Sequence, residues 1–386
     1  MTAISGIDVL TVELPFRFSF GHALAERRSS TNVFVRLRLE SGIVGYGEGV
    51  PREYVTGESV ESALAALVQR QAPPLVGRKL SDPDEVLTLV DEIPEARPGG
   101  GLDLAARCAL ELALLDAAGK HFDRSVSNWL GGEPTPQVHY DAVLPFSSPK
   151  KVAALSLVIR ALGVKQVKAK VGGDLDKELE SLRILRRFLG SGADLRVDAN
   201  CAWTADEAIT AIRRLGTYGV SAVEQPLPGD DLEGLRKVTD ELEEAIIVDE
   251  SLRTIEDGRA LIEARACDGF NIRVSKNGGL LNSIKLARMA ADAGLFCVVG
   301  AQVGESGVLS AAGRHLAAHI GPRYLEGSAG RLLLKQDVTK ENVLPGRRGR
   351  ARTPVGPGLG VDVVEEVLER LGHVHRTLTP DTVSVR

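Results

Sequence analysis

Between residues 166 and 250 the chain repeats one pattern four times. Short strand-like segments each end on a charged residue: QVKAK (166–170), DLRVD (194–198), VSAVE (220–224) and AIIVD (245–249). Amphipathic helical patterns separate them, for example at Asp174–Leu189 and Thr204–Leu215. Strand-like segments that alternate with helices in this way predict parallel strands buried on both faces of a sheet.

The same alternation extends in both directions along the chain. Further strands are expected at Val138–Leu144, Gly269–Val274, Phe296–Val299 and Arg323–Glu326, which brings the number to eight. Eight such units in roughly 190 residues fit a closed barrel better than an open doubly wound sheet, which rarely repeats so evenly. The predicted fold class is therefore α/β, with a barrel of the TIM type.

The residues on either side of the barrel follow a different order. In the first part, strands come first, at Ile7–Glu13, Thr31–Leu39 and Ile43–Gly49, and helices follow, at Glu58–Gln71, Asp82–Glu92 and Leu102–His121. This order predicts a small α+β domain over residues 1–130, before a barrel domain over residues 131–330. Residues 331–386, with a helix expected at Asp362–Leu371, are predicted to return to the first domain.

Composition excludes several classes of protein. The 386 residues are 44% hydrophobic and 26% charged, as in ordinary globular proteins. The net charge of −5 gives no field that would attract nucleic acid, so no nucleic-acid partner is expected. The four cysteines have neither zinc-ligand nor redox spacing. No window has the roughly 18–20 apolar residues of a membrane span, and Met1–Pro15 does not resemble a signal peptide. We expect a cytoplasmic protein without a membrane partner.

Three acidic residues stand at the C-terminal ends of consecutive predicted strands: Asp198, Glu224 and Asp249. In a parallel barrel these ends gather at the face that carries the active site. Clustered carboxylates repel one another unless a cation lies among them, and an all-oxygen ligand set favours a hard ion such as Mg²⁺. The alternative interpretation is a set of strand-end acids paired with basic side chains.

Lysines flank these acids. Lys168 and Lys170 are two residues apart in a predicted strand, so both side chains project to the same side of it. We expect two neighbouring ammonium groups to lower the pKa of at least one of them, as a general base requires. Lys276 would approach from the opposite side of the barrel. A base on each face of a carbon beside a metal-bound carboxylate can remove and replace an α-proton through an enediolate.

These motifs, with Gly45-Tyr46-Gly47-Glu48 near the N-terminus, resemble the enolase superfamily and its muconate lactonizing enzyme subgroup. The resemblance implies a modified (β/α)₇β barrel with an α+β N-terminal capping domain. It also implies Mg²⁺, or Mn²⁺ as an alternative, on Asp198, Glu224 and Asp249. Lys170 and Lys276 would be the acid/base groups, and Lys168 would tune Lys170. The neighbouring residues expected to support the site are Asn200, Gln225 and Glu250.

Members of this subgroup catalyse different reactions, namely cycloisomerisation, o-succinylbenzoate synthesis, N-acylamino acid racemisation and dipeptide epimerisation. Residues 18–22 and 51–58 look like the mobile loops that cover the substrate in dipeptide epimerases, and the eighth strand keeps one of the two acids that hold the ammonium group there. The seventh-strand segment, residues 300–306, departs from the muconate pattern, in which the glutamate comes one position earlier. The predicted substrate contacts are Phe20, His22, Arg52, Tyr54, Gln302, Glu305, Tyr324 and Glu326.

The sequence thus predicts a Mg²⁺-dependent racemase or epimerase that acts on a small carboxylate, a dipeptide or an N-acylamino acid. A cycloisomerase, or a lyase of the o-succinylbenzoate synthase or dehydratase type, would use the same residues. A Schiff-base aldolase with a barrel lysine as nucleophile is a more distant alternative. A binding barrel without catalysis is a further one. A symmetric homo-oligomer is expected.

Overall fold

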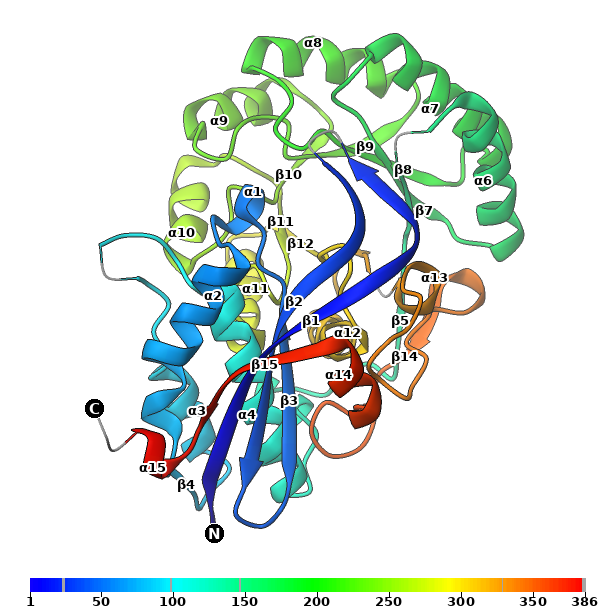
Figure 1. Cartoon of the computed structure of the whole chain (residues 1–386). Helices are drawn as coiled ribbons and strands as arrows, with labels where there is room; N and C mark the ends of the chain where they lie inside the picture. Colours follow the sequence, from blue (N-terminus) through cyan, green and yellow to red (C-terminus); the bar gives the residue numbers. More distant parts are fainter. Residues whose placement is uncertain (23–24, 98, 146, 328, 384–386) are drawn as a thin grey trace.

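Eight parallel strands form the central sheet, and they follow one another in space in chain order (Figure 1). Their bounds are β6 (Ala142–Leu144), β7 (Gln166–Lys170), β8 (Asp194–Asp198), β9 (Val220–Glu224), β10 (Ala245–Val248), β11 (Gly269–Ile272), β12 (Phe296–Val299) and β13 (Tyr324–Leu325). The amide of Asp141 donates to the carbonyl of Leu325 at 2.8 Å, which joins the two ends of the sheet. The structure is a computed structural model that describes residues 1–22, 25–97, 99–145, 147–327 and 329–383.

Helices on the outside of the sheet connect these strands. They are α6 (Pro149–Leu162), α7 (Leu175–Leu189), α8 (Ala205–Gly216), α9 (Leu232–Glu241), α10 (Ile255–Ala264), α11 (Leu280–Asp292) and α12 (Gly307–Ile320). Capping boxes start two of them, with Thr204 and Glu207 at α8 and Thr254 and Asp257 at α10. The predicted barrel, with its alternation of strands and helices, is confirmed.

The first predicted barrel strand is wrong in one respect. Residues Val138–Leu144 form two short strands, because β5 (Gln137–His139) pairs antiparallel with β14 (Arg350–Arg352) and β6 alone joins the barrel. The break falls at Tyr140 and Asp141, whose amides bond to Gly349 and Leu325 rather than to one common strand.

A second, antiparallel sheet lies at the N-terminal end of the chain. It contains β1 (Thr2–His22), β2 (Ala25–Leu39) and β3 (Val44–Gly49), and β15 (Gly372–Leu378) adds to its edge beside β1. The other elements of this part are β4 (Lys79–Leu80), α1 (Glu53–Thr56), α2 (Val60–Ala66), η1 (Leu67–Gln71), η2 (Pro73–Leu75), α3 (Glu85–Asp91) and α4 (Leu104–His121). Short elements complete the chain: α5 (Ser127–Leu130), α13 (Gly330–Leu333), η3 (Arg347–Gly349), α14 (Glu365–Leu371) and α15 (Pro380–Val383).

Strand β3 packs against α4 through glycines. Gly45, Gly47 and Gly49 lie on one side of β3, and a Cβ atom on any of them would collide with the backbone of α4. For Gly47 the obstacle is the carbonyl of Ala109. Helix α4 is buried on all sides from Leu104 to Gly119, which is typical of a helix enclosed by other elements. The glycines of the Gly45–Glu48 motif are therefore needed for close packing.

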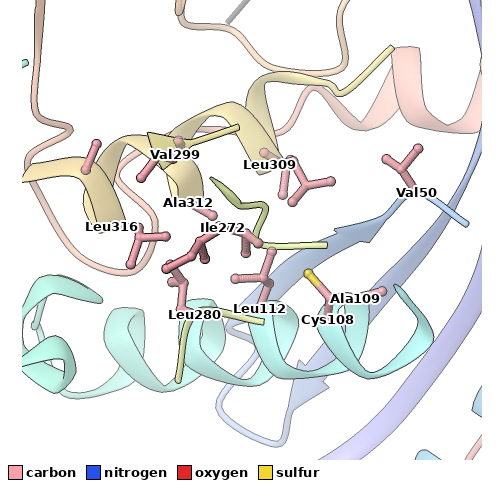
Figure 2. Packing of buried hydrophobic residues seen from close by; sticks show 14 of the residues in the cluster. Val50, Cys108, Ala109, Leu112, Ile272, Leu280, Val299, Leu309, Ala312 and Leu316 are labelled. Carbon is pink, nitrogen blue, oxygen red and sulfur yellow. The ribbon is translucent and has the colours of Figure 1, made fainter. Parts of the chain in front are cut away.

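The capping domain is attached to the barrel by an apolar contact between α4 and the barrel elements. Figure 2 shows Cys108 and Leu112 of α4 facing Ile272 of β11, Leu280 of α11 and Leu316 of α12. Two buried glutamates of the capping domain also complete the starts of barrel helices. Glu48 accepts from the Ser306 amide at 2.9 Å at the start of α12, and Glu111 accepts from the Leu281 amide at 3.0 Å at the start of α11.

The described helices include none that is both long enough and apolar enough to span a membrane.

Candidate active site

The three predicted acids lie side by side at the C-terminal ends of the barrel strands. Asp198 ends β8, Glu224 ends β9, and Asp249 directly follows β10. Lys170 on β7 pairs in register with Asp198, which pairs in turn with Glu224. All three acidic side chains are completely buried. The strand repeat therefore brings them together at one level of the barrel, as the sequence predicted.

The two lysines of β7 contact this group of acids differently. The Lys168 ammonium lies 2.6 Å from Glu326 Oε1, 3.1 Å from Glu224 Oε1 and 3.3 Å from Asp198 Oδ2, and its side chain is 3% exposed. The Lys170 ammonium lies 2.6 Å from Asp198 Oδ2 and 2.5 Å from Asn200 Oδ1. Because 15% of the Lys170 side chain is exposed, Lys170 is the lysine of this pair that a ligand can approach.

The pKa values show how the charges influence one another. Burial acts against the charged form of Lys168, but Glu224, Glu326 and Asp198 outweigh it and raise the pKa of this lysine above its usual range. The expectation that a lysine neighbour lowers the pKa does not hold for Lys168, because three carboxylates surround it. Burial also acts against ionised Asp198, yet Lys170 and Lys168 hold its pKa below the ordinary value.

On the sixth barrel strand, an arginine faces the acids. Asn271 and Arg273 are two residues apart in the chain. The side-chain amide of Asn271 donates to Glu224 Oε1 at 2.9 Å. Arg273 pairs with Asp249 Oδ2 and donates to Gln302 Oε1 at 3.2 Å. Arg273 is not among the residues predicted from the sequence, although its position two residues after Asn271 places both side chains on the same side of the strand.

Lys276 lies in the turn after β11 and is fully buried. Its ammonium donates to the Asp249 carbonyl at 2.7 Å, to Asp249 Oδ1 at 2.8 Å and to the Asn271 carbonyl at 2.8 Å. An ammonium group has three donors, so all the donors of Lys276 are used. The structure therefore places Lys276 beside Asp249, bonded to the backbone directly after β10 and within β11.

The residues predicted to support the site adjoin the three acids. The Asn200 amide donates to Glu250 Oε1 at 3.2 Å, and Gln225 Oε1 accepts from the Asp249 amide at 2.8 Å. Asn200 and Gln225 both have left-handed backbone conformations, with φ of 45° and 37°. Such strained conformations in residues other than glycine are frequent at functional sites. Here they turn the chain directly after β8 and β9.

The charges and donors around the acids fit a divalent cation. Seven carboxyl groups meet five cationic side chains here: Asp141, Asp198, Glu224, Asp249, Glu250, Glu305 and Glu326 against Lys168, Lys170, Arg196, Arg273 and Lys276. The carboxyl groups therefore outnumber the cationic side chains by two. Burial and neighbouring acids raise the pKa of both Glu224 and Glu250 to about 7, and Glu250 Oε2 is buried without a hydrogen-bond partner.

The oxygen-only donor set suits Mg²⁺, whose charge would balance the excess. Within the described ranges, no three His, Cys, Asp or Glu side chains are grouped closely enough to hold an ion. Asp198, Glu224 and Asp249 each bond to a lysine or an arginine, so an ion would have to replace some of these bonds.

The residues predicted to contact substrate lie in different places. Gln302, Glu305 and Glu326 line one cavity next to the acids. Arg52 is buried and donates to the Ser30 hydroxyl at 2.5 Å and to the Val303 carbonyl at 3.2 Å, whereas Tyr54 is 41% exposed. Phe20 and His22 fall at the end of β1, and their side chains are outside the described residues.

Tyr324 is a correction to the predicted set. Its hydroxyl donates to Asp194 Oδ2 at 3.0 Å, and Asp194 is the first residue of β8. Tyr324 is therefore buried near the N-terminal ends of the strands, away from the acids. Tyr324 and Glu326 are two residues apart and share one face of the strand. Glu326 lies at the mouth of the barrel, and Tyr324 lies deeper in its interior.

Comparison with known families identifies the class of protein. The family described as "Mandelate racemase / muconate lactonizing enzyme, N-terminal domain" matches residues 3–131, and the family "Enolase C-terminal domain-like" matches residues 151–367. The chain therefore belongs to the mandelate racemase and muconate lactonizing enzyme family of the enolase superfamily. Enzymes of this superfamily generally depend on Mg²⁺.

Individual relatives cover almost the whole chain. The N-succinyl-L-Arg/Lys racemase of Bacillus cereus is 28% identical over 95% of this chain and 97% of its own, and its crystal structure matches with a TM-score of 0.87. The L-Ala-D/L-Glu epimerase of Bacillus subtilis is 30% identical over 92% and 95% of the two chains. The muconate lactonizing enzyme of Pseudomonas fluorescens matches with a TM-score of 0.87 and 28% identity over 96% and 100%. The predicted superfamily and the predicted isomerase class are confirmed.

Proposed function

We propose that this protein is a Mg²⁺-dependent racemase or epimerase that removes and returns the α-proton of a dipeptide or an N-acylamino acid. The observation that carries the proposal is the position of Lys170. Its partly exposed ammonium lies within 2.6 Å of Asp198, the first of three buried acids on consecutive strand ends. The similarity to racemases and epimerases supports the same reaction.

Asp198, Glu224 and Asp249 would hold the metal ion, and Mn²⁺ is an alternative to Mg²⁺. The bound ion supplies positive charge beside the substrate carboxylate, which stabilises the negative charge that develops when the α-proton leaves. Gln225 fixes the backbone of Asp249, and Asn200 connects Lys170 to Glu250. These contacts hold the acids and the base in fixed relative positions.

Lys170 would take the α-proton on one face of the substrate. Asn200 Oδ1 and Asp198 Oδ2 orient its ammonium group, and its exposure leaves a path for a ligand. Lys168 is bonded to Glu326 and Glu224 and keeps a fixed positive charge next to Lys170.

Arg273 follows β11, four strands round the barrel from Lys170, and would lie at the opposite face of the substrate, which favours a second candidate function. A guanidinium group does not release its proton near neutral pH, and Lys276 has no free donor in its present position. With Lys170 as the one proton carrier and Arg273 as a fixed positive charge, the site suits a one-base reaction of the cycloisomerase type. A two-base racemase requires that Lys276 leave its bonds to Asp249 and Asn271.

The products distinguish the two functions. Dipeptides and N-acylamino acids of known configuration are incubated with the Mg²⁺-loaded protein in D₂O, and α-deuteration and epimer formation are followed by NMR and chiral chromatography. A racemase produces the deuterated epimer, whereas a one-base enzyme exchanges the α-proton with retention or converts a muconate-like diacid. Protein treated with a chelator is the control. Absence of α-exchange across the whole panel would contradict the proposed racemase.

A further inference from the structure

A cavity of about 330 Å³ lies beside the acids, between the loops that follow β12 and β13 and helix α13. We call it the distal cavity and define it by six of its lining residues: Asp141, Gln302, Glu305, Ser310, Glu326 and Leu332. Its volume is at the lower end of the roughly 300–1,000 Å³ of ordinary small-molecule sites. The cavity thus has room for one substituent of a substrate.

The distal cavity borders the site of the proposed reaction. Gln302, in its wall, accepts a hydrogen bond from Arg273 at 3.2 Å, and Glu326 lies 2.6 Å from the Lys168 ammonium. Through Gln302 and Glu326 the cavity wall therefore contacts Arg273 and Lys168, which pair with the buried acids, so a substrate held at these acids can extend one of its ends toward the cavity.

Among the described residues, three buried polar atoms in the cavity wall have no hydrogen-bond partner. They are Asp141 Oδ1, Gln302 Nε2 and Ser310 Oγ. Gln302 and Ser310 are each 4% exposed, and the Asp141 side chain is completely buried. A buried polar group without a partner is costly, and three of them around one cavity indicate that a polar ligand supplies the missing partners.

The charge of the wall indicates the sign of that ligand. Three of the lining residues are acidic, and within the described part of the wall none is basic. Asp141 and Glu326 are already paired with Arg196. Glu305 accepts from the Gln302 amide at 2.5 Å, and no ion pair to it is present in the described residues. Burial raises the pKa of Glu305 to about 8, although Arg273 and Arg52 act in the opposite direction.

We propose that the distal cavity binds the positively charged end of an aliphatic substituent on the substrate, with Glu305 as the acceptor of the charge. The apolar wall, which includes Val143, Leu332 and Leu333, would pack against the aliphatic stem. This inference rests on the proposed function, because the α-proton reaction at Lys170 is what places the substrate next to the cavity.

The sequence of the eighth strand suggested a different acceptor for an ammonium group, namely the acid on that strand, Glu326. Glu326 is bonded to Lys168 and Arg196, so its charge is already neutralised. Tyr324 lies at the other end of the barrel. The carboxyl group left for a cationic ligand is therefore on the loop between β12 and α12.

The test compares three N-acetyl amino acids with side chains of similar length: lysine, norleucine and 2-aminoadipate. Their α-hydrogen exchange in D₂O is measured as kcat and KM for the wild type and for Glu305→Gln. We expect the lysine compound to have the highest kcat/KM with the wild type. Glu305→Gln should lower that value roughly 10- to 100-fold, mainly through KM, and change the norleucine value less than about twofold.

A second variant tests the proposal at an exposed position, where a substitution should not affect folding. Leu332 is 64% exposed and lies in the cavity wall, so Leu332→Lys adds a positive charge with little risk to the core. It should weaken the lysine compound and improve the 2-aminoadipate compound, while Leu332→Gln changes neither. A wild type that prefers norleucine or 2-aminoadipate, or variants that affect all three compounds equally, would overturn the proposal.

Binding separates this proposal from the proposed function. Calorimetry with the same compounds needs no turnover. Tighter binding of the lysine compound to the wild type than to Glu305→Gln supports the cavity assignment even when no exchange is seen, an outcome in which only the proposed reaction fails. Equal binding of the lysine and norleucine compounds to the wild type would overturn the cavity assignment.

Discussion

Lys170 and Asp198 occupy directly paired positions on β7 and β8, and their charged groups lie 2.6 Å apart. The barrel register thus fixes a candidate base against a candidate metal ligand. Because Asp198 is completely buried and Lys170 is partly exposed, the pair is approached from the lysine side. This pairing of Lys170 with Asp198 determines the effects that we expect from substitutions in the candidate active site.

Metal binding should stabilise the native protein. A ligand that binds only the folded state raises the melting temperature as its concentration increases. We expect MgCl₂ to raise the melting temperature of the wild type and to have a much smaller effect on Asp249→Asn, which removes one of the three acids. Glu256→Gln, on the exposed surface of α10, is the matched control and should respond like the wild type. Equal responses of the wild type and Asp249→Asn would argue against a metal at these acids.

Lys276 should be needed for stability as well as for activity. Lys276→Met leaves the carbonyls of Asp249 and Asn271 without their donor inside the core. Removing one member of a buried charge pair costs about 3–5 kcal/mol, so thermal melts should show a loss of several degrees. Lys237→Met removes an exposed ion pair and should change the melting temperature little. A Lys276→Met variant with the wild-type melting temperature would show that the bonds of Lys276 are dispensable.

Gly47→Ala should weaken the attachment of β3 to α4. The added methyl group meets the Ala109 carbonyl, and overpacking of this kind costs about 1–3 kcal/mol. Gly313→Ala is a useful contrast, because this glycine lies within α12 with open space around it and alanine favours the helix. Chemical denaturation should show a loss of stability for the first variant and none for the second. Equal stabilities would mean that β3 can move away from α4 at no cost.

Asp8 should make the stability of the N-terminal sheet depend on pH in the acidic range. Burial acts against its ionisation, but Arg38, Thr377 and Arg36 lower its pKa to about 2, from 3.8. A lowered pKa stabilises the folded state above pH 3.8, and this stability is lost as the pH falls through 2. It amounts to about 1–2 kcal/mol.

Melting temperatures of the wild type and Asp8→Asn, measured between pH 5 and pH 2, test this. The wild type should be more stable at pH 5, and the difference should shrink towards pH 2. A constant difference over this range would show that the Asp8 charge does not contribute.

The sequence predicted the barrel because its strands and helices have regular, local patterns. The acids at 198, 224 and 249 follow the strand repeat, so their meeting at one face required only the rule that parallel strands end together. The split of Val138–Leu144 was missed, because it depends on β14, more than 200 residues further along the chain. Local patterns do not reveal such a partner.

The predicted site was less accurate where tertiary contacts decide the role of a side chain. Lys276 was predicted from the sequence as a lysine of the site. Its backbone acceptors, the carbonyls of Asp249 and Asn271, could not be predicted. Arg273 was overlooked in favour of a lysine three residues later. The distal cavity could not be predicted at all, because its wall combines Asp141, directly before β6, with the loops after β12 and β13.

The assignment of Lys170 as the base is tested by the rate of α-hydrogen exchange in Lys170→Arg. This variant keeps the positive charge beside Asp198 but lacks a group that releases a proton near neutral pH. With both enantiomers of a substrate that the Mg²⁺-loaded wild type deuterates in D₂O, we expect Lys170→Arg to lose exchange at the α-carbon of at least one enantiomer by at least about 10²-fold, since general-base catalysis contributes 10²–10⁴-fold. Its melting temperature and its response to Mg²⁺ should remain close to those of the wild type. Exchange at an undiminished rate with both enantiomers in Lys170→Arg would contradict the assignment of Lys170 as the base.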